Sequence, residues 1–386
     1  MAAVTMPCAF ARPALRTSAR APRRPLQTRR SVAAAAFTSE NPAKICVLGA
    51  SGYTGADVTR LLACHPQMKI TAMTAESNAG KLLADIYPHL LNATDVPRLI
   101  KNAEVDWSQI DGAFCCLPHA TTQEIVKTIP KHVKIVDLSA DFRLSDVETY
   151  ATWYGGAHLA PELQKEAVYG LTELNREAVR GARLVANPGC YPTSVQLPLV
   201  PLLRKGMIST NNIFIDSKSG VTGAGRSAKV GILFCEVSEG MHGYGVGSHR
   251  HMPEIEQELS KASGKDVRIS FTPHLIPMNR GMLSTIYVGL EQGQTVDGLR
   301  AELKDFYATE RFVTVMDKGQ VPHTRYVRGS NYNYIGVFED RLPGRAIIMS
   351  VIDNVVKGAS GQAVQNMNLV LGLDEGEGLM QQPMFP

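Results

Sequence analysis

The sequence predicts an α/β protein, with a parallel sheet in its first half and a layer of α+β type after it. Short apolar runs alternate with helical stretches such as residues 122–129, which is typical of βαβ units. The runs lie at residues 45–48, 70–73, 113–117, 135–138 and 184–186. After residue 190, glycine-rich loops separate longer strand candidates, at 213–217, 283–290 and 346–352. The last periodic segment, 363–371, is predicted to be a helix that covers the earlier domain.

The first 36 residues differ in composition from the rest of the 386-residue chain. They hold seven of its 40 basic residues, all arginine, and no acidic residue occurs before Glu40. Such leaders are typical of organellar transit peptides, and we assign residues 1–37 to one; a basic tail that stays attached is the alternative. Without those seven arginines, 33 basic residues stand against 36 acidic ones, which removes the charge argument for nucleic-acid binding. No run of 18 apolar residues predicts a membrane span.

Seven cysteines form no CxxC pair and no regular framework. Structural disulfides and a zinc site of thiolates are therefore not expected, and we predict no metal. Cys46, Cys115 and Cys116 lie in or next to apolar runs, where cysteine acts as a small buried hydrophobe. Cys190 lies among proline, glycine and tyrosine instead.

A glycine turn at residues 49–55, GASGYTG, follows a predicted strand and opens a predicted helix. Glycines let the backbone approach a pyrophosphate, and a helix N-terminus favours its negative charge, so the turn indicates dinucleotide binding. Its GxxGxxG spacing departs from GxGxxG, and a plain tight turn is the alternative. The sequence alone does not decide between NAD and NADP. Glu76 favours a free ribose hydroxyl, as in NAD, whereas Ser77 and Lys81 favour the 2′-phosphate of NADP.

The segment around Cys190, NPGCYPT, is the most informative of the chain. Pro192 suits the first turn of a helix, so Cys190 is predicted at a helix N-terminus. There the amides and the helix dipole lower the pKa of a thiol and make it a nucleophile. The alternative is a capping turn with an inert thiol.

Two histidines provide an acid or base for such a nucleophile. His249 and His251 lie two residues apart before Pro253, which predicts an extended segment with the two side chains on opposite sides. Only one of them is then expected to face the thiol. A pair of metal ligands is the alternative, but no third ligand is evident. His119, His242 and His274 are expected to have surface or structural roles.

Five segments together resemble the family of N-acetyl-gamma-glutamyl-phosphate reductases of arginine biosynthesis. They span nearly all of the chain after the leader, at residues 49–55 (GASGYTG), 138–143 (LSADFR), 187–193 (NPGCYPT), 217–226 (SKSGVTGAGR) and 249–254 (HRHMPE). The resemblance implies the fold of semialdehyde and glyceraldehyde-phosphate dehydrogenases, with NADP as cofactor and a homo-oligomer, dimer or tetramer. Residues 40–187 would form a Rossmann-type NADP-binding domain, completed by a C-terminal helix at 361–373, and residues 188–360 the catalytic and oligomerisation domain.

The resemblance also implies roles for individual residues. Cys190 matches the nucleophile and His249 the acid/base, while Arg143, Arg226 and Arg250 are candidates for holding the substrate's carboxylate or phosphate. The predicted cofactor contacts are Gly49, Ser51, Gly52, Tyr53, Thr54, Gly55, Ser77, Leu117, Pro118, Ser219, Gly220, Gly223, Ala224 and Gly225.

The expected reaction converts N-acetyl-glutamyl 5-phosphate to the semialdehyde through a thioester on Cys190. Three alternatives are an aspartate-semialdehyde dehydrogenase, a cysteine/histidine hydrolase that needs no cofactor, and a redox sensor that binds dinucleotide. The leader fits either plastid or mitochondrion, and the resemblance to plant and algal forms favours the plastid.

Overall fold

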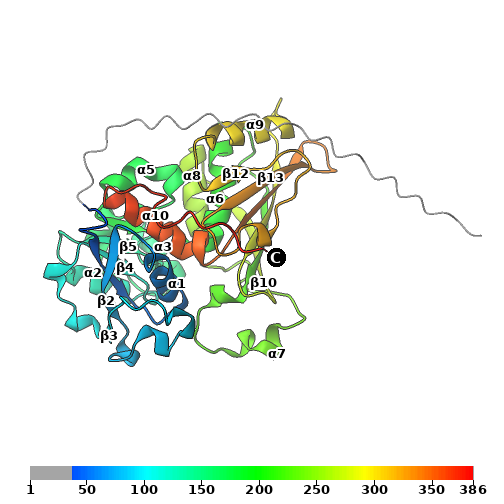
Figure 1. The fold of residues 1–386 in the computed structure, drawn as a ribbon. Coiled ribbons are helices and arrows are strands. Elements are labelled where there is room, and N and C mark those ends of the chain that lie inside the picture. Colours follow the sequence, from blue (N-terminus) through cyan, green and yellow to red (C-terminus); the bar gives the residue numbers. More distant parts are fainter. Residues whose placement is uncertain (1–36, 386) are drawn as a thin grey trace, which may run out of the picture. The chain divides into compact units, whose positions relative to one another are not determined.

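The computed structural model describes residues 37–385 and contains two seven-stranded sheets (Figure 1). The predicted transit peptide lies outside the described residues, except for Phe37. Within residues 37–385 no helix has the length and apolar character needed to cross a membrane.

The first sheet is parallel throughout, with the strand order β3-β2-β1-β4-β5-β7-β6. Its strands are β1 (Ala43–Leu48), β2 (Met68–Thr74), β3 (Leu99–Ile100), β4 (Gly112–Cys115), β5 (Lys134–Asp137), β6 (Val168–Tyr169) and β7 (Leu184–Ala186). Its helices are α1 (Tyr53–Leu62), α2 (Thr122–Thr128), α3 (Val147–Tyr154), α4 (Pro161–Glu166) and α5 (Thr172–Gly181). Leu48 pairs with Cys115, and Cys115 with Asp137, so the loops after β1, β4 and β5 leave the sheet at one edge. Ligands of open parallel sheets bind at this edge.

The second sheet is mixed, with the order β12-β13-β14-β11-β8-β10-β9. Its strands are β8 (Ile213–Gly220), β9 (His242–Gly243), β10 (Ile269–Ile276), β11 (Met282–Gly289), β12 (Val313–Val315), β13 (Asn333–Glu339) and β14 (Arg345–Ile352). Helices of this part are α6 (Cys190–Arg204), α7 (Phe234–Val237), α8 (Met252–Ser263) and α9 (Val296–Phe306). The inward residues of the strands form one core with α6, α8 and α9. These three helices cover only that face of the sheet, and none of them packs on the other face.

The chain returns to the first sheet at its end. A π-helical turn, Val356–Ser360, leads into α10 (Gly361–Val370), which packs against α1, α5 and β5. Figure 1 shows this red helix beside the blue and green elements of the first sheet. Ala363, Val364 and Met367 are buried in one cluster with β1 and β2.

The α/β class predicted from the sequence is confirmed, and the predicted elements match the observed ones to within a few residues. The predicted helix 122–129 is α2, and the segment 363–371 is α10. The strand predicted at 213–217 continues to Gly220 as β8, so it includes the first residues of the glycine-rich segment 217–226.

Candidate active site

The glycine turn between β1 and α1 leaves little room for side chains. Gly49 has a φ of +73°, and a Cβ on it would lie 2.5 Å from the carbonyl oxygen of Cys116. A Cβ on Gly55 would lie 2.6 Å from the Cα of Ala50. Helix α1 begins after Gly52, and no side chain caps its first amides. Free amides at a helix start and a cradle without side chains suit a pyrophosphate, so these residues fit the predicted dinucleotide.

The other predicted cofactor contacts lie on two kinds of segment. Some are in loops that leave the first sheet at the same edge, and the others are in a loop of the second sheet. Leu117 and Pro118 follow β4, and Ser77 is exposed in the turn after β2. Residues 219–225 include the end of β8, and the next residue, Arg226, donates from Nη1 to the carbonyl oxygen of Ser51 at 3.5 Å. A loop of the second sheet therefore lies against the glycine turn of the first.

The three arginines predicted to hold the substrate lie in different surroundings. The Arg226 guanidinium lies 5.1 Å from the ring centre of Tyr87, beside the glycine turn. Arg250 lies over the ring of Tyr154 at 5.4 Å, and residues 37–385 offer its guanidinium no hydrogen bond or ion pair. Arg143 is buried and bonded to the protein, as described below. The charges of Arg143 and Arg250 both act on Tyr154, His119 and His251, so these two arginines lie around one site, whereas Arg226 lies beside the glycine turn.

Cys190 is the first residue of α6 and keeps part of its surface exposed. Its neighbourhood is crowded, because a Cβ on Gly358 in the π-helical turn would lie 2.8 Å from the Cβ of Cys190. Burial of the sulfur raises the pKa of the Cys190 thiol to about 11, although Arg143 and the amide of Tyr191 act to lower it. The predicted position at a helix N-terminus is confirmed, but the predicted lowering of the pKa is wrong. Burial disfavours the thiolate more than the helix start favours it.

The turn before Cys190 is held by one buried carboxylate. The Glu254 Oε1 atom accepts hydrogen bonds from the backbone N–H of Gly189 and the hydroxyl of Tyr169, both at 2.8 Å. Its Oε2 atom faces Nη1 of Arg143 at 3.4 Å. Arg143 also donates from Nε to the carbonyl of Asn187 at 2.8 Å. The guanidinium that was predicted to bind substrate is therefore largely used in positioning the Cys190 turn.

The two histidines lie on the same side, which corrects the prediction that they face opposite sides. Residues 245–251 form turns and not a strand, and His251 precedes α8 with helical φ and ψ of −82° and −9°. The ring centres of His249 and His251 lie 4.8 Å apart, and both rings stand edge-on to Tyr191. A Cβ on Gly189 would lie 2.7 Å from His251, so this ring contacts the Cys190 turn directly.

The hydrogen bonds of His249 determine which of its nitrogens carries a proton. Its Nδ1 atom accepts the backbone N–H of His251 at 3.1 Å, so the neutral ring carries its proton on Nε2. Burial, together with the charge of Arg250, lowers the pKa of His249 to about 4. Burial also lowers the pKa of His251 well below its usual value, with smaller effects from His249 and Arg143. Both rings are neutral near pH 7.

Sequence reasoning did not assign roles to Glu254, Tyr169 or Gly358. Glu254 belongs to the segment HRHMPE, but nothing in its spacing indicates that its partner is the amide of Gly189, 65 residues earlier. His119, expected to be structural or on the surface, accepts the N–H of Ala140 through Nδ1 at 3.0 Å. The described residues contain no cluster of three or more histidine, cysteine or acidic side chains that could hold a metal ion.

Two family models match the chain, one for each sheet. Residues 44–182 match the NAD binding domain of semialdehyde dehydrogenases, and residues 190–354 match their dimerisation domain. Among solved structures, the chain resembles aspartate semialdehyde dehydrogenase II of Vibrio cholerae complexed with ASA, with a TM-score of 0.65 at 16% identity over 86% of this chain and 98% of that one. The Candida albicans aspartate semialdehyde dehydrogenase with NADP gives 0.61 at 18% identity, over 85% and 98%. At these identities the likeness shows the fold alone, which is that of the semialdehyde dehydrogenases.

Curated relatives narrow the assignment. A protein of Oryza sativa subsp. japonica named "Probable N-acetyl-gamma-glutamyl-phosphate reductase, chloroplastic" is 60% identical over 89% of this chain and 82% of its own length. The protein of the same name from Arabidopsis thaliana is 56% identical over 92% and 88%. The N-acetyl-gamma-glutamyl-phosphate reductase of Rhodospirillum rubrum is 58% identical over 89% and 98%. The chain belongs to the N-acetyl-gamma-glutamyl-phosphate reductase family of the semialdehyde dehydrogenases.

We expect the reactivity of Cys190 to rise with pH. A thiol is protonated below its pKa, so with a pKa of about 11 the thiolate fraction grows about tenfold for each pH unit between 7 and 9. Alkylation by iodoacetamide, followed at the Cys190 peptide by mass spectrometry, measures this fraction, with the exposed Cys64 as an accessible reference. A rate at Cys190 that is already constant above pH 7 would show that the thiol is ionised in the resting protein.

Proposed function

We propose that the protein reduces N-acetyl-L-glutamyl 5-phosphate to N-acetyl-L-glutamate 5-semialdehyde and phosphate, a step of arginine biosynthesis, through a thioester on Cys190. The relatives' names support the substrate. One structural observation carries the chemistry: Cys190 begins α6 between Gly189, which contacts His251, and Tyr191, whose ring contacts both neutral histidines. The loop after β8 also contacts the glycine turn. A cysteine/histidine hydrolase would have no use for that turn.

NADP is the cofactor we propose. Support comes from the end of β2, where the backbone N–H of Asn102 donates to Oε1 of Glu76 at 2.9 Å. That oxygen is already used within the protein, which weakens the argument for Glu76 as a ribose ligand. Ser77 and Lys81 are exposed beside it and suit a 2′-phosphate. When bound, the nicotinamide supplies the hydride.

The residues of the chain perform the remaining steps. The Cys190 sulfur attacks the γ-carbonyl, and phosphate departs with the electron pair of the broken C–O bond and takes up the thiol proton. The amides at the start of α6 lack a side-chain cap, and they stabilise the oxyanion. After hydride transfer, the Nε2–H of neutral His249 donates its proton to the oxyanion, and the ring takes this proton back as the carbonyl re-forms. The C–S bond breaks in that step, and the released thiolate takes up one proton from water, which restores the thiol. Arg250, whose guanidinium has the fewest bonds to the protein of the three arginines, is the best candidate for the substrate's carboxylate or phosphate.

A homo-oligomer, dimer or tetramer, is proposed to form through the second sheet. Strand register places Phe214, Tyr287, Ile347 and Phe338 side by side across β8, β11, β14 and β13. This apolar row is partly or fully exposed on the face opposite the core with α6, α8 and α9. An apolar row on an open sheet is a usual place for a second copy to pack, and the family model for this region is a dimerisation domain.

The plastid is the proposed location. The arginine-rich leader predicts an organelle, and two relatives carry the word chloroplastic in their names.

We expect Cys190→Ala to abolish turnover, with a loss of about 10⁴-fold or more, because no other group replaces the nucleophile. The affinity for NADPH should stay unchanged, since the glycine turn is a separate part of the site. Steady-state assays and a fluorescence titration with NADPH, with NADH as the weaker ligand, measure the two quantities. Cys64→Ala is the matched control, and appreciable turnover by Cys190→Ala would end the thioester mechanism.

His249→Asn should lower kcat by about 10²- to 10⁴-fold, which is the usual contribution of a positioned proton donor. We expect His251→Asn to lower kcat less, because we assign no proton transfer to that ring. Thermal unfolding of both variants separates a loss of chemistry from a loss of folding. If His251→Asn proved the more damaging at equal stability, the proton donor would be the other ring.

Phe214→Glu should convert the oligomer to smaller species, because it places a charge within the apolar row. Light scattering coupled to gel filtration measures the molecular mass in solution. Leu342→Glu is the control, because Leu342 is 57% exposed and Phe214 is 42% exposed, but Leu342 lies in a loop outside the row. This variant should leave the mass unchanged. If the wild type, Phe214→Glu and Leu342→Glu all had the same mass, the interface would lie outside the apolar row.

A further inference from the structure

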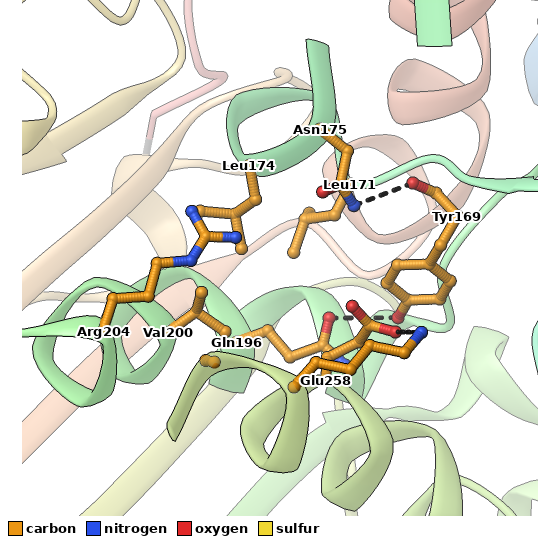
Figure 2. Close-up of a pocket in the computed structure, with 10 residues that line it drawn as sticks. Tyr169, Leu171, Leu174, Asn175, Gln196, Val200, Arg204 and Glu258 are labelled. Atoms are coloured by element: carbon orange, nitrogen blue, oxygen red, sulfur yellow. Dashed lines mark hydrogen bonds and ion pairs between the residues drawn. The ribbon is translucent and has the colours of Figure 1, made fainter. Parts of the chain in front are cut away.

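A cavity of about 130 Å³ lies between α5, α6 and α8, and the reaction described above does not use it. Figure 2 shows the Arg204 side chain extending beside Leu174, while Tyr169 and Glu258 lie across the cavity from it. A cavity of about 150 Å³ holds a benzene-sized molecule, so this space suits the hydrocarbon body of a short-chain carboxylate, of about four to five carbons.

The walls of the cavity are mainly polar, with a few apolar side chains and one positive charge that no described residue pairs. Leu171, Leu174 and Val200 supply apolar contacts. The charge of Glu258 is matched by Lys261, whose Nζ lies 2.8 Å from Oε1. Arg204 lines the cavity and is also exposed to solvent, and none of residues 37–385 gives its guanidinium a hydrogen bond or an ion pair. A free guanidinium beside an apolar wall is suited to a carboxylate that carries a short hydrocarbon body.

The cavity is connected to the Cys190 turn through a single side chain. Tyr169 lines the cavity, and its hydroxyl donates to Oε1 of Glu254 at 2.8 Å and lies 3.0 Å from Oε1 of Gln196. The same Glu254 oxygen accepts the N–H of Gly189, the residue before Cys190. A molecule packed against the Tyr169 ring therefore restrains the hydroxyl that helps to hold Glu254.

We propose that the cavity lined by Arg204, Leu174 and Tyr169 binds a small organic carboxylate, and that its occupancy restrains the Cys190 turn through Tyr169 and Glu254. Arg204 binds the carboxylate, and Leu171, Leu174 and Val200 contact the hydrocarbon body. The effect on the active site is indirect, because the ligand touches neither Cys190 nor the glycine turn.

Binding is tested with pentanoate on the full-length chain by isothermal titration calorimetry, with 1-pentanol and pentylammonium as neutral and cationic probes. Pentanoate should bind saturably and the other two should not. Arg204→Gln should weaken binding about tenfold or more, as expected for a lost charge-assisted hydrogen bond. Lys205→Gln, the adjacent residue, which pairs with Glu302 at 3.4 Å and does not line the cavity, should bind pentanoate as the wild type does. Absent binding, binding unchanged in Arg204→Gln, or equal binding of 1-pentanol would overturn the proposal.

The connection to Cys190 is tested by alkylation, which needs no turnover and so does not depend on the proposed reaction. Saturating pentanoate should slow the alkylation of Cys190 by iodoacetamide at least twofold and leave that of Cys64 unchanged. Tyr169→Phe keeps the cavity wall but removes the hydroxyl, so it should still bind pentanoate while the slowing disappears. If Tyr169→Phe shows the same slowing as the wild type, or if Arg204→Gln does, the connection through Tyr169 is wrong.

Discussion

The Cys190 turn depends on one buried carboxylate. Glu254 is only 1% exposed, and its two oxygens meet Gly189, Tyr169 and Arg143. A buried charge is tolerated only where it is paired and hydrogen-bonded, so these partners are tied to one another. Arg143 comes from the loop after β5, Tyr169 from β6 and Gly189 from the segment after β7, whereas Glu254 lies in α8. A single side chain therefore joins elements of both sheets next to Cys190, the proposed nucleophile.

A second close contact of Cys190 comes from the segment by which the chain returns to the first sheet. Gly358 approaches Cys190 so closely that no Cβ fits between them. The neighbouring Lys357 is fully buried, and its Nζ lies 2.6 Å from Oε1 of Glu173 in α5. This ion pair fixes the position of the π-helical turn, which leads directly into α10 on the first sheet. Cys190 is therefore positioned both by α8, through Glu254 and Gly189, and by the C-terminal segment, through Gly358.

Much of the fold could be predicted because its signals are local. The apolar runs of β1, β2 and β7 and the glycine turn after β1 depend on residues adjacent in the sequence. Other elements gave weak signals: β3, β6 and β9 have two residues each, and β10 contains Pro273, which speaks against a strand inside a sheet.

The candidate site was predicted less completely, because its properties depend on distant contacts. The position of Cys190 at a helix start follows from Pro192, but its pKa depends on burial by elements such as the π-helical turn at residues 356–360. The orientation of the histidines depends on the turns before α8, which alternation along an extended segment cannot anticipate. The substrate role expected of Arg143 could not be weighed without knowing that Glu254 lies beside it.

Burial acts in opposite directions on the thiol and on the two histidines, and the result is a resting site without charge on any of the three. It raises the pKa of Cys190 and lowers those of His249 and His251, because each group avoids its charged form in an apolar environment. A stable thiolate–imidazolium pair would fill the site with charge before the substrate arrives. In the proposed reaction, the neutral arrangement leaves the amides of α6 to act on the negative charge that develops during attack, and Arg250 to hold the substrate. The same burial that keeps the free thiol protonated would therefore leave these amides without a resting thiolate to stabilise, so that in the proposed reaction they act on the transition state.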